Sequence, residues 1–91
     1  MSVKVKIPTP LRKLTGERDV VEGDGASLAE CISGLDGAYP GLRERLCDEQ
    51  GELRRFVNVY INGEDVRFLS GVATPLKQGD EVAIVPAVAG G

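Results

Sequence analysis

The stretch that decides the fold is Phe56-Val57-Asn58-Val59-Tyr60-Ile61-Asn62-Gly63. Its side chains alternate between two faces, with Val57, Val59 and Ile61 on one and Phe56, Asn58 and Tyr60 on the other. This alternation and the β-branched residues predict a central strand over 56–61. Asn-Gly is favoured in a type I′ turn, because both positions need a positive φ. We therefore expect residues 64–68 to fold back as a short hairpin partner.

Three other segments have strand character. They are residues 3–7, where Val and Ile alternate with Lys, residues 18–22 before the Gly23-Asp24-Gly25 turn, and residues 81–85 after the Gln78-Gly79-Asp80 turn. Pro8 and Pro10 end the first segment, because proline supplies no hydrogen-bond donor to a sheet. The first two segments should pair as a hairpin.

One main helix is expected from residue 28. Ser27 and Glu30 have the spacing of a capping box, in which each side chain accepts a backbone N–H of the other residue. The apolar face of the helix carries Leu28, Ile32 and Leu35. We expect Gly37 to end the helix and Pro40 to open a second short helical segment.

The element order is strand, strand, helix, strand, short strand, strand. It predicts an α+β fold in which a mixed sheet of four to five strands packs on one main helix. This order fits a β-grasp, whose first and last strands lie side by side in the centre of the sheet. We expect residues 1–85 to form this domain and residues 86–91 to form a flexible tail that ends in Gly-Gly.

The composition disfavours most enzyme classes. A chain of 91 residues supports one small domain, and with no His and only four aromatic residues it lacks imidazole catalysis and an aromatic pocket. The net charge of -3 without a basic stripe argues against a nucleic-acid partner. No signal peptide or transmembrane segment is visible, so we expect a cytoplasmic protein.

The two cysteines lack the spacing of a metal or redox motif. We expect Cys31 to be a small core residue and Cys47 to be the more exposed thiol. No metal site is expected.

The chemistry of this chain is expected in its tail. Small residues at Ala89 and Gly90, with Val88 before them, would let the terminus enter a narrow tunnel and present the Gly91 carboxylate. A C-terminal carboxyl has a pKa of about 3.3 to 3.7, so at neutral pH it is an anion and a poor electrophile. An ATP-using partner would have to adenylate it, after which sulfur can attack the acyl adenylate and leave a thiocarboxylate. We expect no trimming, because the sequence ends at these glycines.

The outward face of the central strand is the second candidate site. If its valines face the helix, Phe56 and Tyr60 point outward, with Arg67, Lys4 and Lys6 near them. An apolar centre with a basic rim often marks a protein interface. We interpret Phe56, Tyr60 and Arg67 as a docking patch for partner enzymes.

Three segments together resemble the ubiquitin-like sulfur carriers. They are residues 56–68, the Gly79-Asp80-Glu81-Val82 turn, and the ending Ile84-Val85-Pro86-Ala87-Val88-Ala89-Gly90-Gly91. This group includes the small subunit of molybdopterin synthase and the carrier of thiazole synthesis. The chain is most similar to the carrier of the bacterial cysteine-synthesis branch, and the similarity also covers Ile7-Pro8-Thr9 and residues 44–46.

The resemblance implies a carrier protein without a bound cofactor, which acts as a co-substrate of other enzymes. An adenylyltransferase of the ubiquitin-activating type would use ATP to activate Gly91, and the thiocarboxylate would then give sulfide to an accepting synthase. In the cysteine branch that synthase depends on pyridoxal phosphate, and a zinc metalloprotease releases the new cysteine from the tail.

Other readings stay open at this level. The carrier could serve as the small subunit of molybdopterin synthase, or supply sulfur for thiazole or a thiosugar, because the choice of acceptor resides in the partner enzymes. A protein modifier, which forms isopeptide bonds to lysines of its targets, would use the same tail. A plain β-grasp interaction module would not need Gly91 at all.

Overall fold

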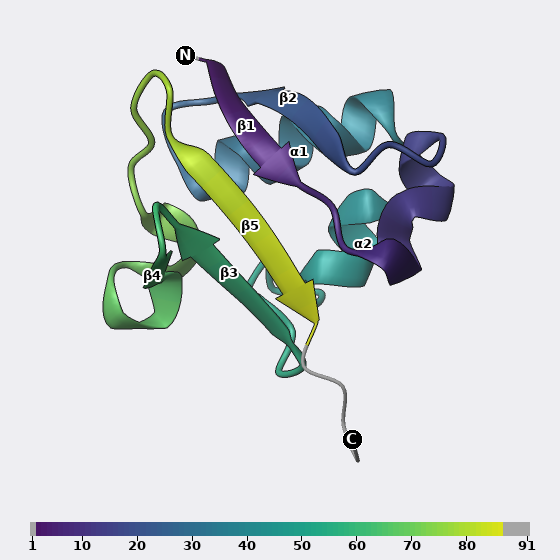
Figure 1. The fold of residues 1–91 in the computed structure, drawn as a ribbon. Helices are drawn as coiled ribbons and strands as arrows, with labels where there is room; N and C mark the ends of the chain where they lie inside the picture. Colours follow the sequence, from purple (N-terminus) through teal and green to yellow (C-terminus); the bar gives the residue numbers. More distant parts are fainter. Residues whose placement is uncertain (1, 87–91) are drawn as a thin grey trace.

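The computed structural model describes residues 2–86. Five strands form one sheet in the order β2-β1-β5-β3-β4, and Figure 1 shows α1 and α2 together behind it. The strands are β1 (Ser2–Lys6), β2 (Val20–Asp24), β3 (Val57–Ile61), β4 (Glu64–Asp65) and β5 (Glu81–Pro86). The helices are α1 (Leu28–Ala38) and α2 (Leu42–Leu46), with 3-10 helices η1 (Thr9–Thr15), η2 (Val66–Phe68) and η3 (Gly71–Ala73).

The first and last strands lie side by side. β1 and β5 are parallel, whereas the pairs β1–β2, β3–β5 and β3–β4 are antiparallel. This mixed sheet, packed on helices on one side only, confirms the predicted α+β class and the β-grasp fold.

The core lies between the sheet and α1. The expected alternation holds: Val3 and Val5 of β1 and Val59 of β3 are buried, and Lys4 and Lys6 are exposed. The buried face of α1 carries the three expected residues together with Cys31: Leu28, Cys31, Ile32 and Leu35. Each fully buried aliphatic side chain contributes about 1.5–3 kcal/mol, so this layer supplies most of the driving force for folding.

The capping box of α1 forms with one change. Ser27 Oγ accepts a hydrogen bond from Glu30 N at 3.3 Å, as expected. The Glu30 carboxylate accepts from Ala26 N at 3.4 Å instead of from Ser27 N. Residues 26–28 also contact the segment before β5, because Leu28 N donates to Thr74 O and Leu76 N donates to Ala26 O. The start of the helix is therefore tied to a distant loop that the local motif does not include.

The end of α1 lies beyond the predicted Gly37. Tyr39 N donates to Leu35 O at 2.7 Å, and the Asp36 carboxylate accepts from the N–H groups of Gly41 and Arg43 at 3.1 Å. These bonds put the reversal at Gly41, whose φ of 99° favours glycine. As a result α2 begins after Gly41, and Pro40 lies in the connection instead of opening the helix.

The predicted bounds of the first four strands were wrong. β1 spans Ser2–Lys6 instead of residues 3–7. β2 begins at Val20 and continues through Asp24, because Gly23 and Asp24 still pair with β1. β3 begins at Val57 instead of Phe56. The predicted hairpin partner over 64–68 is a strand at only two residues, since the Asp65 carboxylate accepts from Arg67 N at 2.8 Å and starts η2.

β5 extends one residue further than expected. It includes Pro86, which lies opposite Val57. Asn62 N donates to Glu81 O, and hydrogen-bonded pairs recur at every second position of an antiparallel ladder. Pro86 and Val57 therefore form a non-hydrogen-bonded pair, in which residue 86 donates no backbone N–H to β3. Proline, which lacks this N–H, fits the position.

Candidate functional site

The face of the sheet turned away from α1 and α2, here called the outer face, is open to solvent across its centre. Figure 1 shows the sheet in front of both helices. Register places Tyr60 opposite Ala83 and Ala83 beside Lys6, so these three side chains form one row across β3, β5 and β1. Asn58 and Val85 form the next row toward the tail.

The predicted patch residues occupy three different positions. Phe56, just before β3, is 56% exposed. Tyr60 lies in the middle of β3 and is half-buried between Ala83 and Asp65. Arg67 lies in η2 and is exposed. The structure brings Arg67 to the strand through its contact with Asn58, which stands between Phe56 and Tyr60 in the sequence.

The guanidinium of Arg67 donates hydrogen bonds to three acceptors within the protein. Its Nη2 donates to Val57 O at 2.7 Å and to Arg54 O at 3.2 Å, and its Nη1 donates to Asn58 Oδ1. A guanidinium has five N–H donors in a planar fork, so one side chain can join several acceptors. Arg67 thus fastens η2 to the beginning of β3.

The basic rim is smaller than the sequence suggested. Lys4 lies between Glu22 of β2 and Glu81 of β5, so neighbouring carboxylates offset its charge. Lys6 lies between Val20 and Ala83, beside apolar neighbours. Of the two lysines, Lys6 is the one placed to serve a docking surface.

Two apolar residues of this face were not among the predicted site residues. Val20 and Val85 are each 43% exposed. Alternation along 81–85 would have placed Val85 outward, since Val82 and Ile84 face the core. Val20 lies on the same face as Arg18 and Glu22 in the predicted strand, so alternation also placed it outward, but it was not considered as a site residue.

The predicted tail residues lie outside the described part of the chain. These are Val88, Ala89, Gly90 and Gly91, whose roles in access and sulfur attachment stay predictions. The last described residue is Pro86, held beside Val57 at one end of the outer face. The described structure therefore places the base of the tail at the end of β5, next to Phe56 and Asn58.

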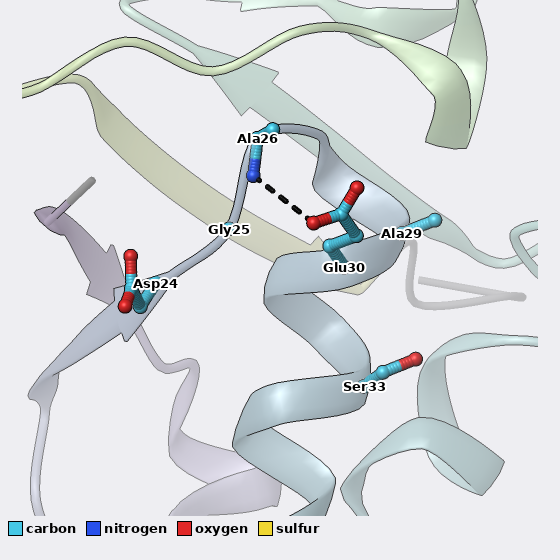
Figure 2. A pocket seen from close by; sticks show the side chains of 6 residues that line it. All are labelled: Asp24, Gly25, Ala26, Ala29, Glu30 and Ser33. Carbon is cyan, nitrogen blue, oxygen red and sulfur yellow. Dashed lines mark hydrogen bonds between the residues drawn. The ribbon is translucent and has the colours of Figure 1, made fainter.

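A shallow hollow lies between the end of β2 and the first turns of α1. Figure 2 shows its lining residues, which are Asp24, Gly25, Ala26, Ala29, Glu30 and Ser33. The Glu30 carboxylate is turned toward Ala26 N and acts as part of the helix cap. This hollow brings together small residues and carboxylates, without a nucleophile and base pair, so it supplies no catalytic set.

Both cysteines are buried free thiols. Cys31 is a core residue, as predicted, and burial, with a further contribution from Asp24, raises the pKa of its thiol to about 11. Cys47 is 4% exposed against 1% for Cys31, so it is the more exposed thiol only by a small margin, and both are buried. Burial also raises the pKa of Cys47. The reason is the chain reversal after α2, where Cys47 bridges to Leu53 and becomes covered.

Residues 2–86 contain no group of three His, Cys, Asp or Glu side chains that could hold a metal ion. Within the same range, no helix has both the length and the apolar character needed to cross a membrane.

Comparison with known proteins assigns the family. Residues 5–91 match the ThiS family. The sulfur carrier protein CysO of Mycobacterium tuberculosis is 52% identical, with all of both chains covered. Small archaeal modifier protein 3 of Haloferax volcanii is 36% identical, again over the full length of both.

A solved structure agrees with the sequence relatives. In the crystal structure of the Amycolatopsis orientalis BexX/CysO complex, one chain superposes with a TM-score of 0.92 at 47% identity, covering 98% of this chain and 99% of that one. Its similarity extends over the whole sheet and both helices described above. The chain therefore belongs to the ThiS family of ubiquitin-like β-grasp proteins, in which it is a sulfur carrier and not an enzyme.

Proposed function

We propose that this carrier holds its sulfur as a thiocarboxylate on Gly91 and delivers it in cysteine biosynthesis. The observation that carries the proposal is the 52% identity to a CysO protein over the full chain, which includes the Gly-Gly end. The open outer face beside the base of the tail supports it as well. A partner can hold the domain there while the terminus enters its active site.

The chemistry follows from the carboxylate itself. In the partner enzyme, an oxygen of the Gly91 carboxylate attacks the α-phosphorus of ATP. The bond from this phosphorus to the oxygen that bridges to the β-phosphorus breaks, and pyrophosphate leaves. Hydrogen sulfide, as HS⁻, then attacks the acyl carbon, the bond from this carbon to the phosphate oxygen breaks, and AMP leaves. The product is a thiocarboxylate, which is ionised and nucleophilic at neutral pH. ATP is thus a co-substrate of the partner and not a cofactor held by this chain.

Three kinds of partner follow from this proposal. An adenylyltransferase of the ubiquitin-activating type loads the tail. A cysteine synthase that depends on pyridoxal phosphate accepts the sulfur, and a zinc metalloprotease releases the cysteine. The BexX/CysO complex is a case in which a similar carrier assembles with another protein. We place these steps in the cytoplasm, where ATP is available and thiols such as Cys31 stay reduced.

We further propose that Phe56 and Tyr60 form the docking patch of the carrier. Phe56 lies just before β3, at the end of the sheet where the tail begins, and Tyr60 lies further along β3, opposite Ala83. Aromatic side chains are the commonest energetic anchors of protein interfaces. Phe56 is 56% exposed and Tyr60 is partly exposed, so a partner can reach both side chains.

A second function is favoured by one specific observation, the 36% identity to a small archaeal modifier protein. In a modifier, a lysine amine of a target protein attacks the activated carbonyl, and an isopeptide bond forms. The small subunit of molybdopterin synthase remains the alternative among sulfur carriers. It would differ in the acceptor and not in the loaded form of the tail.

Intact mass spectrometry tests the proposal. The carrier is incubated with ATP, a sulfide source and extract from its own cells, beside a variant that lacks Gly91. We expect a mass increase equal to the exchange of one oxygen for sulfur, dependent on ATP and absent from the variant.

The other outcomes are also informative. Larger conjugates without this exchange would identify a modifier. No ATP-dependent change would overturn both functions and leave a β-grasp interaction module. Supplying the loaded carrier to a cysteine synthase, or to the large subunit of molybdopterin synthase, then identifies the acceptor by its product.

A further inference from the structure

Within residues 2–86, no strand lies beside residues 57–59 of β3 on the side away from β5. β4 pairs with β3 at only two positions, Tyr60 with Asp65 and Ile61 with Glu64. On the other side, β5 follows β3 all the way to the pair Val57 and Pro86. Residues 57–59 therefore have a neighbouring strand on one side only.

The carbonyl of Val57 points toward this open edge. The bond from Asn62 N to Glu81 O, 2.8 Å long, marks that pair as hydrogen-bonded, and such pairs alternate along the ladder. Counting back along β3, Asn58 falls in a hydrogen-bonded pair with Val85, and Val57 does not. A strand edge leaves such a carbonyl without a ladder partner.

Arg67 occupies the place of the missing strand. Its Nη2 reaches Val57 O at 2.7 Å and Arg54 O at 3.2 Å, and its Nη1 reaches the Asn58 side chain. The carbonyl of Arg54 also accepts from Val57 N at 3.0 Å, so the guanidinium closes the turn that leads into β3. We call these contacts the Arg67 clamp.

η2, which carries Arg67, is itself held in place by hydrogen bonds and by a buried side chain. The Asp65 carboxylate accepts from Arg67 N at 2.8 Å, and Leu69 N donates to Val66 O at 2.9 Å. η2 is anchored below by Val66, which is fully buried. The guanidinium is thus presented from a rigid support and not from a loose loop.

We propose that Arg67 is a positioning residue for the loading reaction. By holding Val57 O and the Asn58 side chain, the Arg67 clamp fixes the beginning of β3. Asn58 forms the hydrogen-bonded pair with Val85, which directly precedes Pro86 and the reactive tail. Correct orientation of a reacting group lowers the entropic part of a barrier, and a small misplacement of the reacting atoms can cost about 100-fold in rate. This inference rests on the proposed function, because it concerns delivery of Gly91 to the activating partner.

Two other roles for Arg67 make different predictions. A docking charge would act on carrier binding, and lysine would restore it. A purely structural contact would affect stability alone. A positioning residue acts on the chemical step, and lysine fails because a single ammonium cannot reproduce the planar fork that bridges these acceptors.

The test measures ATP-dependent thiocarboxylate formation with the full-length carrier as the varied substrate. The variants are Arg67→Lys, Arg67→Gln and Asn58→Ala. The Asn58 variant removes one acceptor of the Arg67 clamp and keeps the guanidinium and its bonds to the backbone. Arg55→Gln is the matched control, since it removes a positive charge from the exposed turn beside the clamp. Thermal unfolding and circular dichroism establish that each variant is folded.

We expect kcat to fall about tenfold in both Arg67 variants and less in Asn58→Ala, with KM for the carrier within about twofold of wild type. The control should leave both constants unchanged. A rise in KM that lysine restores would replace the inference with a docking charge. Unchanged kinetic constants in folded variants would overturn it and leave a structural contact. Failure of the wild type to gain sulfur would instead refute the proposed function.

Discussion

Asn62 Nδ2 lies 2.9 Å from Asp80 Oδ1, and this hydrogen bond joins the turn after β3 to the turn before β5. The other carboxylate oxygen of Asp80 accepts from Lys77 N at 2.9 Å, and Asn62 Oδ1 accepts from Glu81 N at 3.0 Å. The two turns are each recognisable in the sequence, but their mutual contact is not. It fixes the β3–β5 ladder at the end opposite the tail.

The Asn62–Asp80 contact predicts a pH dependence of stability. The hydrogen bond from Asn62, followed by that from Lys77 N, lowers the pKa of Asp80 below its usual 3.8. A carboxyl whose pKa is lower in the folded state stabilises the fold above its unfolded pKa, and this stabilisation is lost as the pH falls through the folded pKa. Asp80→Asn should therefore lower the free energy of unfolding at pH 7 and reduce its decline below pH 4.

Urea unfolding at pH 7 and pH 3 measures this effect, with Glu49→Gln, which removes an exposed loop carboxylate, as the control. We expect a loss of about 1 kcal/mol at pH 7, because the bonds are charge-assisted but open to solvent. Equal losses at both pH values would show that the geometry of the contact matters and its charge does not.

Two glycines should respond in opposite directions to alanine. A Cβ at Gly23 would lie 2.6 Å from Cys31 Sγ and 3.2 Å from Val5 Cγ2, both in the core, whereas one at Gly37 would meet nothing within 4 Å. We expect Gly23→Ala to destabilise the protein by about 1–3 kcal/mol through overpacking. Gly37→Ala should stabilise it by about 0.5–1 kcal/mol, since Gly37 lies within α1. Urea midpoints compare the two, and a destabilised Gly37→Ala would contradict the placement of this residue inside the helix.

The thiols should be unreactive in the folded protein. With a pKa of about 11, only about one Cys31 in a thousand is ionised at pH 8, and the thiolate is the reactive form. Cys47 is protected by burial as well. Alkylation followed by mass spectrometry should therefore label both residues quickly in denaturant and slowly without it. Rapid single labelling of the folded chain at Cys47 would show that the turn after α2 opens readily.

Sequence alone predicted the elements whose signals are local. The alternation around Val59 and the start of α1 at Ser27 depend on neighbouring residues, and so does the turn at Asn62, where φ is 52°. The β-grasp topology followed from the order of these elements.

The errors have a common physical origin in hydrogen bonds and chain reversals that the periodicity of the sequence does not encode. The Asp36 carboxylate moves the reversal from Gly37 to Gly41, and the early end of β4 follows from the start of η2 at Asp65. Burial of Cys47 requires the chain to return near Leu53. Arg67 does lie near β3, as expected, but its bonds to backbone carbonyls leave no trace in the residue pattern.

The docking patch gives the last prediction. Phe56→Ala and Tyr60→Ala should each raise KM for the carrier in thiocarboxylate formation by about 5- to 30-fold, as expected for an interface anchor of about 1–2 kcal/mol. Phe68→Ala is the matched control, because Phe68 is 87% exposed but belongs to η2 and not to β3. Stability should change little for Phe56→Ala, whose ring is already largely exposed. If the Phe68 variant alone impaired loading, the partner would bind at η2, and the docking patch of Phe56 and Tyr60 would not be its docking surface.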